Sequence, residues 1–386
     1  MRDAGSVRLR DGWRETLWAF LGARLLLAAI GVIGGGMLAL PPGQPPTDAG
    51  FPNPVVTPGW HMLFTSLQRQ DAQWFLRIAT TGYARGDNSA AFFPGFPVSV
   101  RLVHLLPGIG PLAAGLLVAN VAAFAALLLL HGLTRYELND EAARRAVLFT
   151  ALFPTAFFLY APYTESLFLL ASIATFWFAR RDRWAWAAVA GAAAAATRSV
   201  GILLILALWV EAIAQQRRDG RALLPRLAAA AAVGIGPLLY FGWWQWQHGS
   251  FWAPLDAQRA WRPGGAHQPI AAITDALTLA WRYQTWWLLD VAVVALAVAG
   301  VALAARRIPL TYTVYAAASL TLPLLLPLDS RPLLSMPRFA AVLFPVSWGW
   351  ALAAARRRPP ETAILIAFTG GFALLAYLFI NWQPVF

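Results

Sequence analysis

Residues 68–97 read QRQDAQWFLRIATTGYARGDNSAAFFPGFP, and the fold and site expected of this chain are organised around them. The first part of the stretch has the periodicity of an amphipathic helix. Asp71 lies on the apolar stripe of that helix, an unfavourable place for a carboxylate unless the group has a function. The apolar stripe consists of Leu67, Trp74, Phe75 and Ile78, and the opposite face of Gln68, Arg69, Gln73 and Arg77.

The helix is expected to end near Gly82, where a polar turn begins. The segment that follows, Phe92 to Pro97, contains two prolines and cannot continue a helix through them. We therefore expect a helix, a turn and an aromatic segment. Two interpretations of the helix stay open: it carries a catalytic carboxylate, or it lies at the membrane interface with Asp71 as a cap.

The composition is that of an integral membrane protein. Of 386 residues, 59% are hydrophobic and 12% are charged, and the mean hydropathy is +0.56. Apolar runs close to the ~20 residues that cross a bilayer recur along the whole chain. The net charge of +12 comes from arginines that gather between these runs, so it indicates membrane topology and no nucleic-acid partner. The chain has no cysteine and its 5 histidines lack metal-ligand spacing, so we expect neither a disulfide nor a metal site.

The apolar runs predict an all-α polytopic protein with about eleven transmembrane helices in one domain, residues 1–386. Arginine clusters follow every second run, which predicts a multi-pass protein of the cell membrane with a cytoplasmic N-terminus. The long outer loops, 41–94 and 248–285, then lie outside the cytoplasm. We expect amphipathic helices in the first loop, a catalytic core over 1–222 and more variable helices over 223–386. The runs are 17–40, 110–133, 146–160, 166–179, 184–196, 200–213, 227–246, 286–305, 309–328, 339–355 and 362–381.

Four ionisable residues border apolar runs on the side away from the arginine clusters: Asp71, Glu165, Arg198 and Arg338. A charge beside a membrane span is costly unless it is paired or lies in a wet cavity, so each is a candidate functional group. Glu165 and Arg198 are expected to form an ion pair. Two roles for that pair stay open, a structural link between helices and a part of a binding site.

Several short motifs resemble those of the PIG-V family, the GPI mannosyltransferase II type of GT-C glycosyltransferases. They are Ile78-Ala79, Gly82-Tyr83, AFFPGFP at 91–97, YTESLF at 163–168 and ATRSVGI at 196–202. The resemblance covers roughly the N-terminal half of the chain, and PRF at 337–339 is a weaker echo of it. The family usually has Trp-Asp at the acidic position, where this chain has Gln70-Asp71.

The resemblance implies a GT-C fold and transfer of mannose from a polyprenyl-phosphate donor, on the extracytoplasmic face, to an acceptor hydroxyl. Asp71 would be the general base, and Arg198 or Arg338 would hold the leaving phosphate. The reaction would invert the anomeric centre without a metal or cofactor. The expected partners are the donor, a glycolipid, glycan or protein acceptor, and the lipid bilayer. Further candidates for substrate binding are Glu165, Trp74, Tyr83, Phe92 and Phe93, although interfacial aromatics are an equal alternative for the rings.

Two other functions remain compatible with the sequence. A transporter or flippase of a lipid-linked sugar would favour internal repeats and broken helices near mid-membrane. A non-catalytic membrane subunit of a glycosylation complex would tolerate the loss of Asp71. Release of polyprenyl phosphate from a synthetic donor discriminates between these functions and an enzyme.

Overall fold

The computed structural model describes residues 12–35, 60–261, 268–356 and 360–383, and within these ranges the regular structure is helical throughout. The predicted all-α membrane fold is therefore confirmed. The N-terminal half contains α1 (Trp13–Gly34), α2 (Met62–Thr65), α3 (Asp71–Thr81), α4 (Gly95–His104), α5 (Pro111–Glu137), α6 (Asp140–Ala151), α7 (Glu165–Ala179), α8 (Trp184–Thr197) and α9 (Leu204–Asp219).

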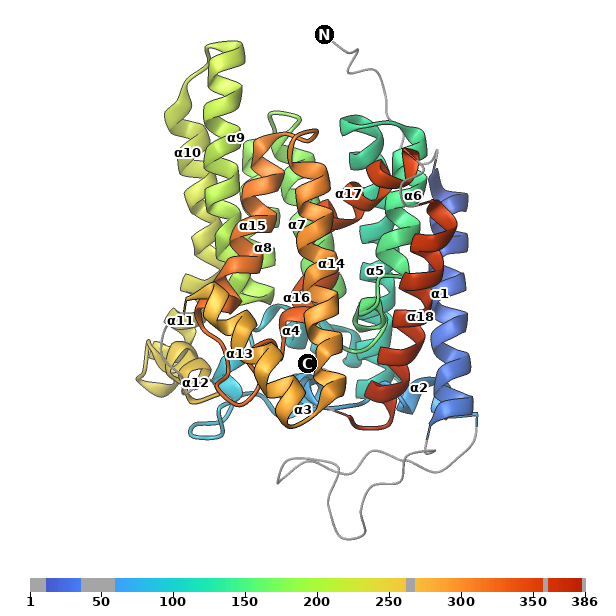
Figure 1. The fold of residues 1–386 in the computed structure, drawn as a ribbon. Helices are drawn as coiled ribbons and strands as arrows, with labels where there is room; N and C mark the ends of the chain where they lie inside the picture. The colour runs from blue at the N-terminus through green and yellow to red at the C-terminus, as the bar shows by residue number, and fades with distance from the viewer. Residues whose placement is uncertain (1–11, 36–59, 262–267, 357–359, 384–386) are drawn as a thin grey trace.

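The C-terminal half continues the bundle and adds two helices at one end of it, α12 and α13 (Figure 1). Short 3₁₀ turns connect several helices, among them Ser89–Ala91, Ala156–Leu159 and Ser199–Leu203. The helices of this half are α10 (Leu223–Ala231), α11 (Ile235–His248), α12 (Ala253–Trp261), α13 (Pro269–Arg282), α14 (Leu288–Ala305), α15 (Leu310–Leu325), α16 (Met336–Ala341), α17 (Phe344–Ala355) and α18 (Glu361–Ile380).

The described parts of the eleven predicted apolar runs fall in helical segments of different lengths, and residues 36–40 of the first run lie outside the described residues. Among the described residues, six segments are long and apolar enough to cross a membrane, and three shorter apolar helices accompany them. The remaining runs, 146–160 and 339–355, are interrupted: α6 ends at Ala151 shortly before Pro154, and α17 begins at Phe344 with Pro345 in its first turn. Proline removes a backbone donor, so these runs do not form full-length helices, which hydropathy alone does not reveal. The six long segments are Trp13–Gly34, Pro111–Glu137, Ser199–Asp219, Leu223–His248, Thr285–Ala305 and Glu361–Ile380.

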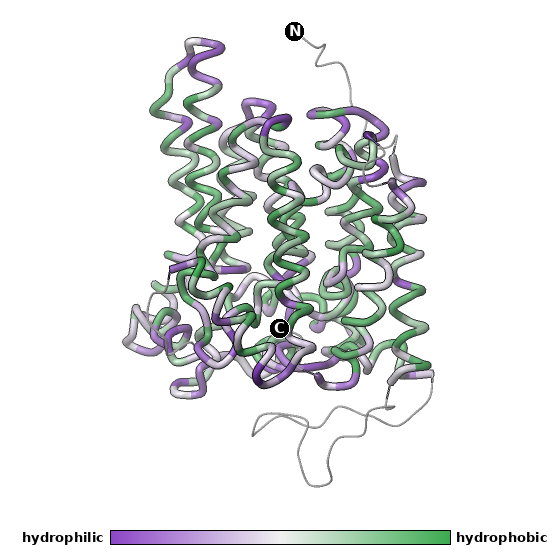
Figure 2. The backbone as a smooth tube through the Cα atoms, in the orientation of Figure 1, coloured by the Kyte–Doolittle hydropathy of each residue, from purple (hydrophilic) through white to green (hydrophobic). Residues whose placement is uncertain are grey.

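The two ends of the bundle differ in what they carry. The turns after α5, α7, α9 and α14 lie at the upper end in Figure 1, and arginines gather in these turns and in the helix ends beside them. The short helices α3, α4, α12, α13 and α16 lie toward the lower end. Figure 2 shows hydrophobic residues through the middle of the bundle and hydrophilic residues at both ends, as a membrane-spanning arrangement requires.

A close packing contact joins the AFFPGFP and ATRSVGI segments. Gly95, the first residue of α4, lies against Thr197 at the end of α8, and a Cβ on Gly95 would overlap the threonine side chain. Glycine at this position therefore lets the two chain segments approach. The contact brings the aromatic segment beside the turn that carries Arg198.

Candidate active site

Asp71, the candidate catalytic carboxylate, is the first residue of helix α3. α3 starts at Asp71, and the preceding Gln70 has a positive φ of 50°, which costs a non-glycine residue about 1 kcal/mol or more. The predicted helix from residue 68 therefore starts three residues later, and its predicted end at Gly82 is confirmed. The Asp71 side chain is 32% exposed, so it is open to an incoming molecule.

Arg69 and Gln73 were predicted to face away from the apolar stripe, and that prediction is wrong. Arg69 is fully buried, and Gln73 is 5% exposed. Arg69 precedes the helix, so helical periodicity does not apply to it. Its guanidinium donates to the carbonyl oxygens of Ile380, 2.8 Å away, and Thr65, 3.0 Å away, and lies over the ring of Trp382.

The backbone around Arg69 is held on two further sides. Tyr163 donates from its hydroxyl to the carbonyl oxygen of Arg69 at 2.9 Å, and Gln70 donates from Nε2 to the carbonyl oxygen of Gln383 at 3.2 Å. The end of α18 and the YTES segment therefore fix the chain immediately before Asp71. These contacts explain how the positive φ of Gln70 persists, because strain survives only where surrounding contacts determine the conformation.

The four ionisable residues singled out in the sequence form one connected cluster, which we call the charge cluster: Asp71, Glu165, Arg198 and Arg338. Arg338 donates from Nη1 to Asp71 at 2.5 Å and from Nε to Glu165 at 2.7 Å. Arg198 donates from Nη1 to the same oxygen of Glu165 and to the hydroxyl of Thr164. The expected ion pair between Glu165 and Arg198 is present, and Arg338 extends it to Asp71.

Burial differs across the charge cluster. The Glu165 side chain is 0% exposed, and the Arg198 and Arg338 side chains are 9% and 8% exposed, against 32% for Asp71. Two carboxylates face two guanidiniums, so the formal charges balance. Burial by itself lowers the pKa of Arg338, but Glu165 and Asp71 outweigh it and hold the pKa above its usual range. Arg338 is therefore a permanent cation beside the accessible carboxylate.

Arg198 has donor capacity left over. Its contacts with Glu165 and Thr164 both use Nη1, and no other described residue accepts a hydrogen bond from its Nε or Nη2. The ring of Phe339 faces the guanidinium, with its centroid 4.8 Å from the central carbon, Cζ. One edge of Arg198 is thus fixed by Glu165, and the remaining N–H groups are available to an anion.

Two of the predicted aromatic residues lie beside the helix that carries Asp71. Trp74, three positions after Asp71 in α3, stacks on Phe92 with ring centroids 5.2 Å apart and planes 15° apart. Trp261, the last residue of α12, meets both rings edge-on at 6.1 and 6.3 Å. The sequence did not single out Trp261, because nothing local in residues 248–285 links it to α3.

The other two predicted aromatic residues lie elsewhere. Phe93 is 4% exposed and packs against Tyr240 and Phe241 of α11. Tyr83 packs against Tyr240 and donates from its hydroxyl to the carbonyl oxygen of Phe92 at 2.8 Å. Their contacts join residues 83–93 to α11.

A divalent cation has no obvious ligand set in the part of the chain that the structure describes. No group of three or more His, Cys, Asp or Glu side chains is placed to hold a metal there. Asp87, the next acidic residue after Asp71 in the chain, is engaged by Arg77 at 2.7 Å and by the backbone N–H of Ser89 at 2.9 Å. Positive charge at the site comes from the two arginines.

Comparison with known proteins agrees with the sequence motifs. Residues 44–217 match the family model described as mannosyltransferase (PIG-V). No curated protein sequence matches the chain. The resemblance inferred from the motifs is therefore confirmed over residues 44–217, which contain Asp71, Glu165 and Arg198, and the match supports a glycosyltransferase.

One solved structure of a GT-C membrane enzyme shares the fold. The structure of ArnT from Cupriavidus metallidurans bound to undecaprenyl phosphate matches with a TM-score of 0.52 at 14% identity, covering 97% of this chain and 77% of that chain. The Archaeoglobus fulgidus oligosaccharyltransferase matches with a TM-score of 0.43 at 12% identity, covering 95% of this chain and 53% of that chain. At this identity the likeness to ArnT establishes the fold, and the predicted GT-C architecture is confirmed.

Proposed function

We propose that this chain, with its match to the PIG-V mannosyltransferase model and its GT-C fold, transfers mannose from a polyprenyl-phosphate donor to an acceptor hydroxyl. One observation carries the proposal. A partly exposed carboxylate, Asp71, and a guanidinium with free donors, Arg198, belong to one charge cluster at one end of a membrane bundle. A base and an anion-binding cation are the two groups that this transfer needs.

The proposed step is a single displacement at the anomeric carbon of the sugar. The acceptor oxygen attacks that carbon as its proton passes to Asp71, and the bond from the carbon to the phosphate oxygen breaks with both electrons leaving on the phosphate. Inversion follows from attack opposite the leaving group. Asp71 is suited to the base role because its side chain is accessible and Arg338 orients it through a hydrogen bond to one oxygen.

Arg198 is the cation we assign to the departing phosphate. Negative charge grows on the phosphate as the bond breaks, so a fixed guanidinium stabilises the transition state more than the bound donor. Arg338 already donates to both Asp71 and Glu165, whereas Arg198 uses a single nitrogen for its hydrogen bonds within the protein. Because guanidiniums supply the charge, the proposed mechanism needs no metal ion. Glu165, fully buried between the arginines, is assigned a positioning role.

The likeness to a structure bound to undecaprenyl phosphate supports a polyprenyl-phosphate donor. We assign the Trp74–Phe92 stack, with Trp261 at its edge, to contacts with the sugar face or the prenyl chain. The arginine-rich end of the bundle is assigned to the cytoplasm, which places the charge cluster on the extracytoplasmic face. The acceptor is a hydroxyl of a glycolipid, a glycan or a protein.

The deciding experiment uses purified protein, polyprenyl-phosphate mannose labelled in the sugar and a membrane extract as the source of acceptors. We expect release of polyprenyl phosphate and transfer of label to a product that mass spectrometry identifies. Movement of intact donor across a vesicle membrane without its cleavage would instead establish a transporter. Cleavage that is unchanged by Asp71→Asn would overturn the assigned base.

A further inference from the structure

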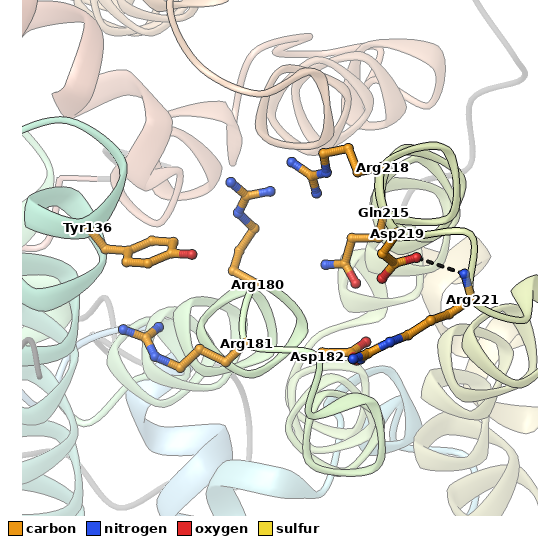
Figure 3. Close-up of a pocket in the computed structure, with 8 residues that line it drawn as sticks. All are labelled: Tyr136, Arg180, Arg181, Asp182, Gln215, Arg218, Asp219 and Arg221. Carbon is orange, nitrogen blue, oxygen red and sulfur yellow. Dashed lines mark hydrogen bonds and ion pairs between the residues drawn. The ribbon is translucent and has the colours of Figure 1, made fainter. Parts of the chain in front are cut away.

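A second polar site lies at the arginine-rich end of the bundle, opposite the charge cluster. It is a cavity of about 310 Å³ between the ends of α5, α7 and α9, which we call the basic pocket (Figure 3). Figure 3 shows the guanidiniums of Arg180 and Arg218 directed toward the space between these helix ends. The residues that line it are Tyr136, Arg180, Arg181, Asp182, Gln215, Arg218, Asp219 and Arg221.

Most of the charges around the basic pocket are neutralised within the protein. Arg180 bonds to the nearly buried carboxylates of Glu137 at 2.6 Å and Glu211 at 2.8 Å, and Glu211 also accepts from Arg218 at 3.1 Å. On the other side, Asp182 and Asp219 are held by the remaining arginines. Those pairs are Arg221 with Asp182, Arg226 with Asp182 and Arg226 with Asp219.

Arg181 is the exception. Its guanidinium lies 3.3 Å from the ring centroid of Trp177 and 4.8 Å from that of Tyr136, and it donates to the carbonyl oxygen of Trp177 at 3.2 Å. No carboxylate of a described residue pairs with it. Counting the pairs above, five guanidiniums meet four carboxylates, so the pocket has a surplus of one positive charge.

The surroundings of the pocket are those of a membrane interface. Trp177 belongs to α7, and the neighbouring Phe178 packs beside Trp186 of α8 with ring centroids 6.1 Å apart. Trp186 is 60% exposed, so this flank presents an apolar surface next to the surplus cation. Tryptophan and arginine together are typical of the level where lipid headgroups lie.

We propose that the basic pocket binds the phosphate of an anionic phospholipid in the leaflet on that side. A phosphodiester carries one negative charge, which matches the surplus of the pocket. The planar guanidinium of Arg181, already held between two rings, offers paired N–H groups to the phosphate oxygens. The exposed flank formed by Phe178 and Trp186 gives the acyl chains a surface that a free phosphate ion would not use. The site is separate from the charge cluster and does not depend on the proposed transfer reaction.

The test measures lipid binding by the purified full-length chain in detergent. Phosphatidylglycerol is titrated into the wild type, Arg181→Gln and Arg183→Gln, and bound lipid is counted by native mass spectrometry, with phosphatidylcholine and inorganic phosphate as parallel probes. Arg183 is an exposed neighbour that does not line the pocket, so it controls for charge alone. We expect saturable phosphatidylglycerol binding that Arg181→Gln weakens at least ~10-fold (about 1.4 kcal/mol), as loss of a hydrogen bond from a charged group predicts, and that Arg183→Gln leaves unchanged.

Three outcomes would overturn the proposal: equal affinity for phosphatidylcholine, equal loss in both variants, and competition by inorganic phosphate at the concentration at which phosphatidylglycerol itself binds. The last result would assign the pocket to a soluble phosphate. A photoactivatable phosphatidylglycerol on the unaltered chain keeps the test independent of variant folding. Its cross-links should fall on the peptides that carry Tyr136 and Arg181, and cross-links confined to the opposite end of the bundle contradict the proposal.

Discussion

Arg338 donates a hydrogen bond to Asp71 although the two residues stand 267 positions apart in the chain. Asp71 lies within the family match over 44–217, and Arg338 lies outside it, in α16. The matched region therefore supplies the accessible carboxylate, while the C-terminal half supplies one of the two cations that face the carboxylates. Without α16, Asp71 would lack the cation that binds it.

Asp71→Asn tests the general base. The amide keeps the shape of the side chain and its place at the start of α3 but cannot accept a proton, so turnover should fall at least ~10²-fold. The measurement is release of polyprenyl phosphate at saturating donor, at matched expression. Asp256→Asn is the control, because Asp256 is a 60% exposed carboxylate at the same end whose partner is Arg259. Near-normal turnover of Asp71→Asn would remove Asp71 from the mechanism.

Glu165→Gln tests the centre of the charge cluster. It leaves two buried guanidiniums facing a neutral amide, and breaking a buried pair in this way costs about 3–5 kcal/mol of unfolding free energy. The check is denaturant or thermal unfolding in detergent. Glu141→Gln is the matched control. The Glu141 side chain is 64% exposed, so its ion pair with Arg145 should contribute only about 0.3–0.5 kcal/mol to the unfolding free energy. Equal losses for the two variants would contradict a buried, charge-dependent cluster.

The sequence predicted that the four residues of the charge cluster lie on one side of the bundle and that Glu165 pairs with Arg198. Asp71, Glu165, Arg198 and Arg338 each border apolar runs, and alternating arginine clusters predict that all four face the same side. A membrane bundle then leaves few ways to satisfy those charges except with one another. The role of Arg338 as the bridge between both carboxylates was not predictable, because it depends on how α16 packs.

The burial of Arg69 was not predictable from helical periodicity. Periodicity predicted a polar face for it, but helix α3 begins only at Asp71, so the helical pattern does not reach Arg69. Its guanidinium donates to a backbone carbonyl oxygen far away in the chain, that of Ile380. Because Ile380 is remote in the chain, the sequence of residues 68–97 contains no pattern that predicts this contact. Trp261 was missed for the same reason, since its neighbours Trp74 and Phe92 are remote in sequence.

Trp382→Leu tests the anchor behind Asp71. The ring of Trp382 lies 4.8 Å from the buried guanidinium of Arg69, and removal of a desolvated cation–π contact should lower the unfolding free energy by about 1–2 kcal/mol. Thermal unfolding of the purified protein measures the effect. Trp246→Leu provides the comparison, because Trp246 is 79% exposed and should tolerate the change. A Trp382→Leu variant as stable as the comparison would show that α18 does not anchor Arg69.

The orientation of the bundle is tested with cysteines, which the natural chain lacks. Arg85 is exposed at the end that carries Asp71, and Arg217 is exposed at the end of α9 among the arginine clusters. A membrane-impermeant thiol reagent applied to intact cells should label Arg85→Cys and leave Arg217→Cys unlabelled until the membrane is opened. The reverse pattern would place the charge cluster in the cytoplasm.

Arg198→Lys tests the cation assigned to the leaving phosphate. Lysine keeps the charge but loses the planar arrangement that lets one edge hold Glu165 and the other edge reach phosphate oxygens. Because charge on the phosphate increases as the bond breaks, the substitution should lower maximal turnover more than it weakens donor binding. Donor-dependent kinetics at matched expression separate the two effects, and Arg306→Lys, an exposed change at the opposite end, is the control.

If Arg198→Lys keeps wild-type turnover and donor dependence while Arg338→Lys loses turnover, the phosphate partner is Arg338. If both variants match the wild type, the cation lies outside the charge cluster, and exposed Arg259 of α12 is the next residue to substitute.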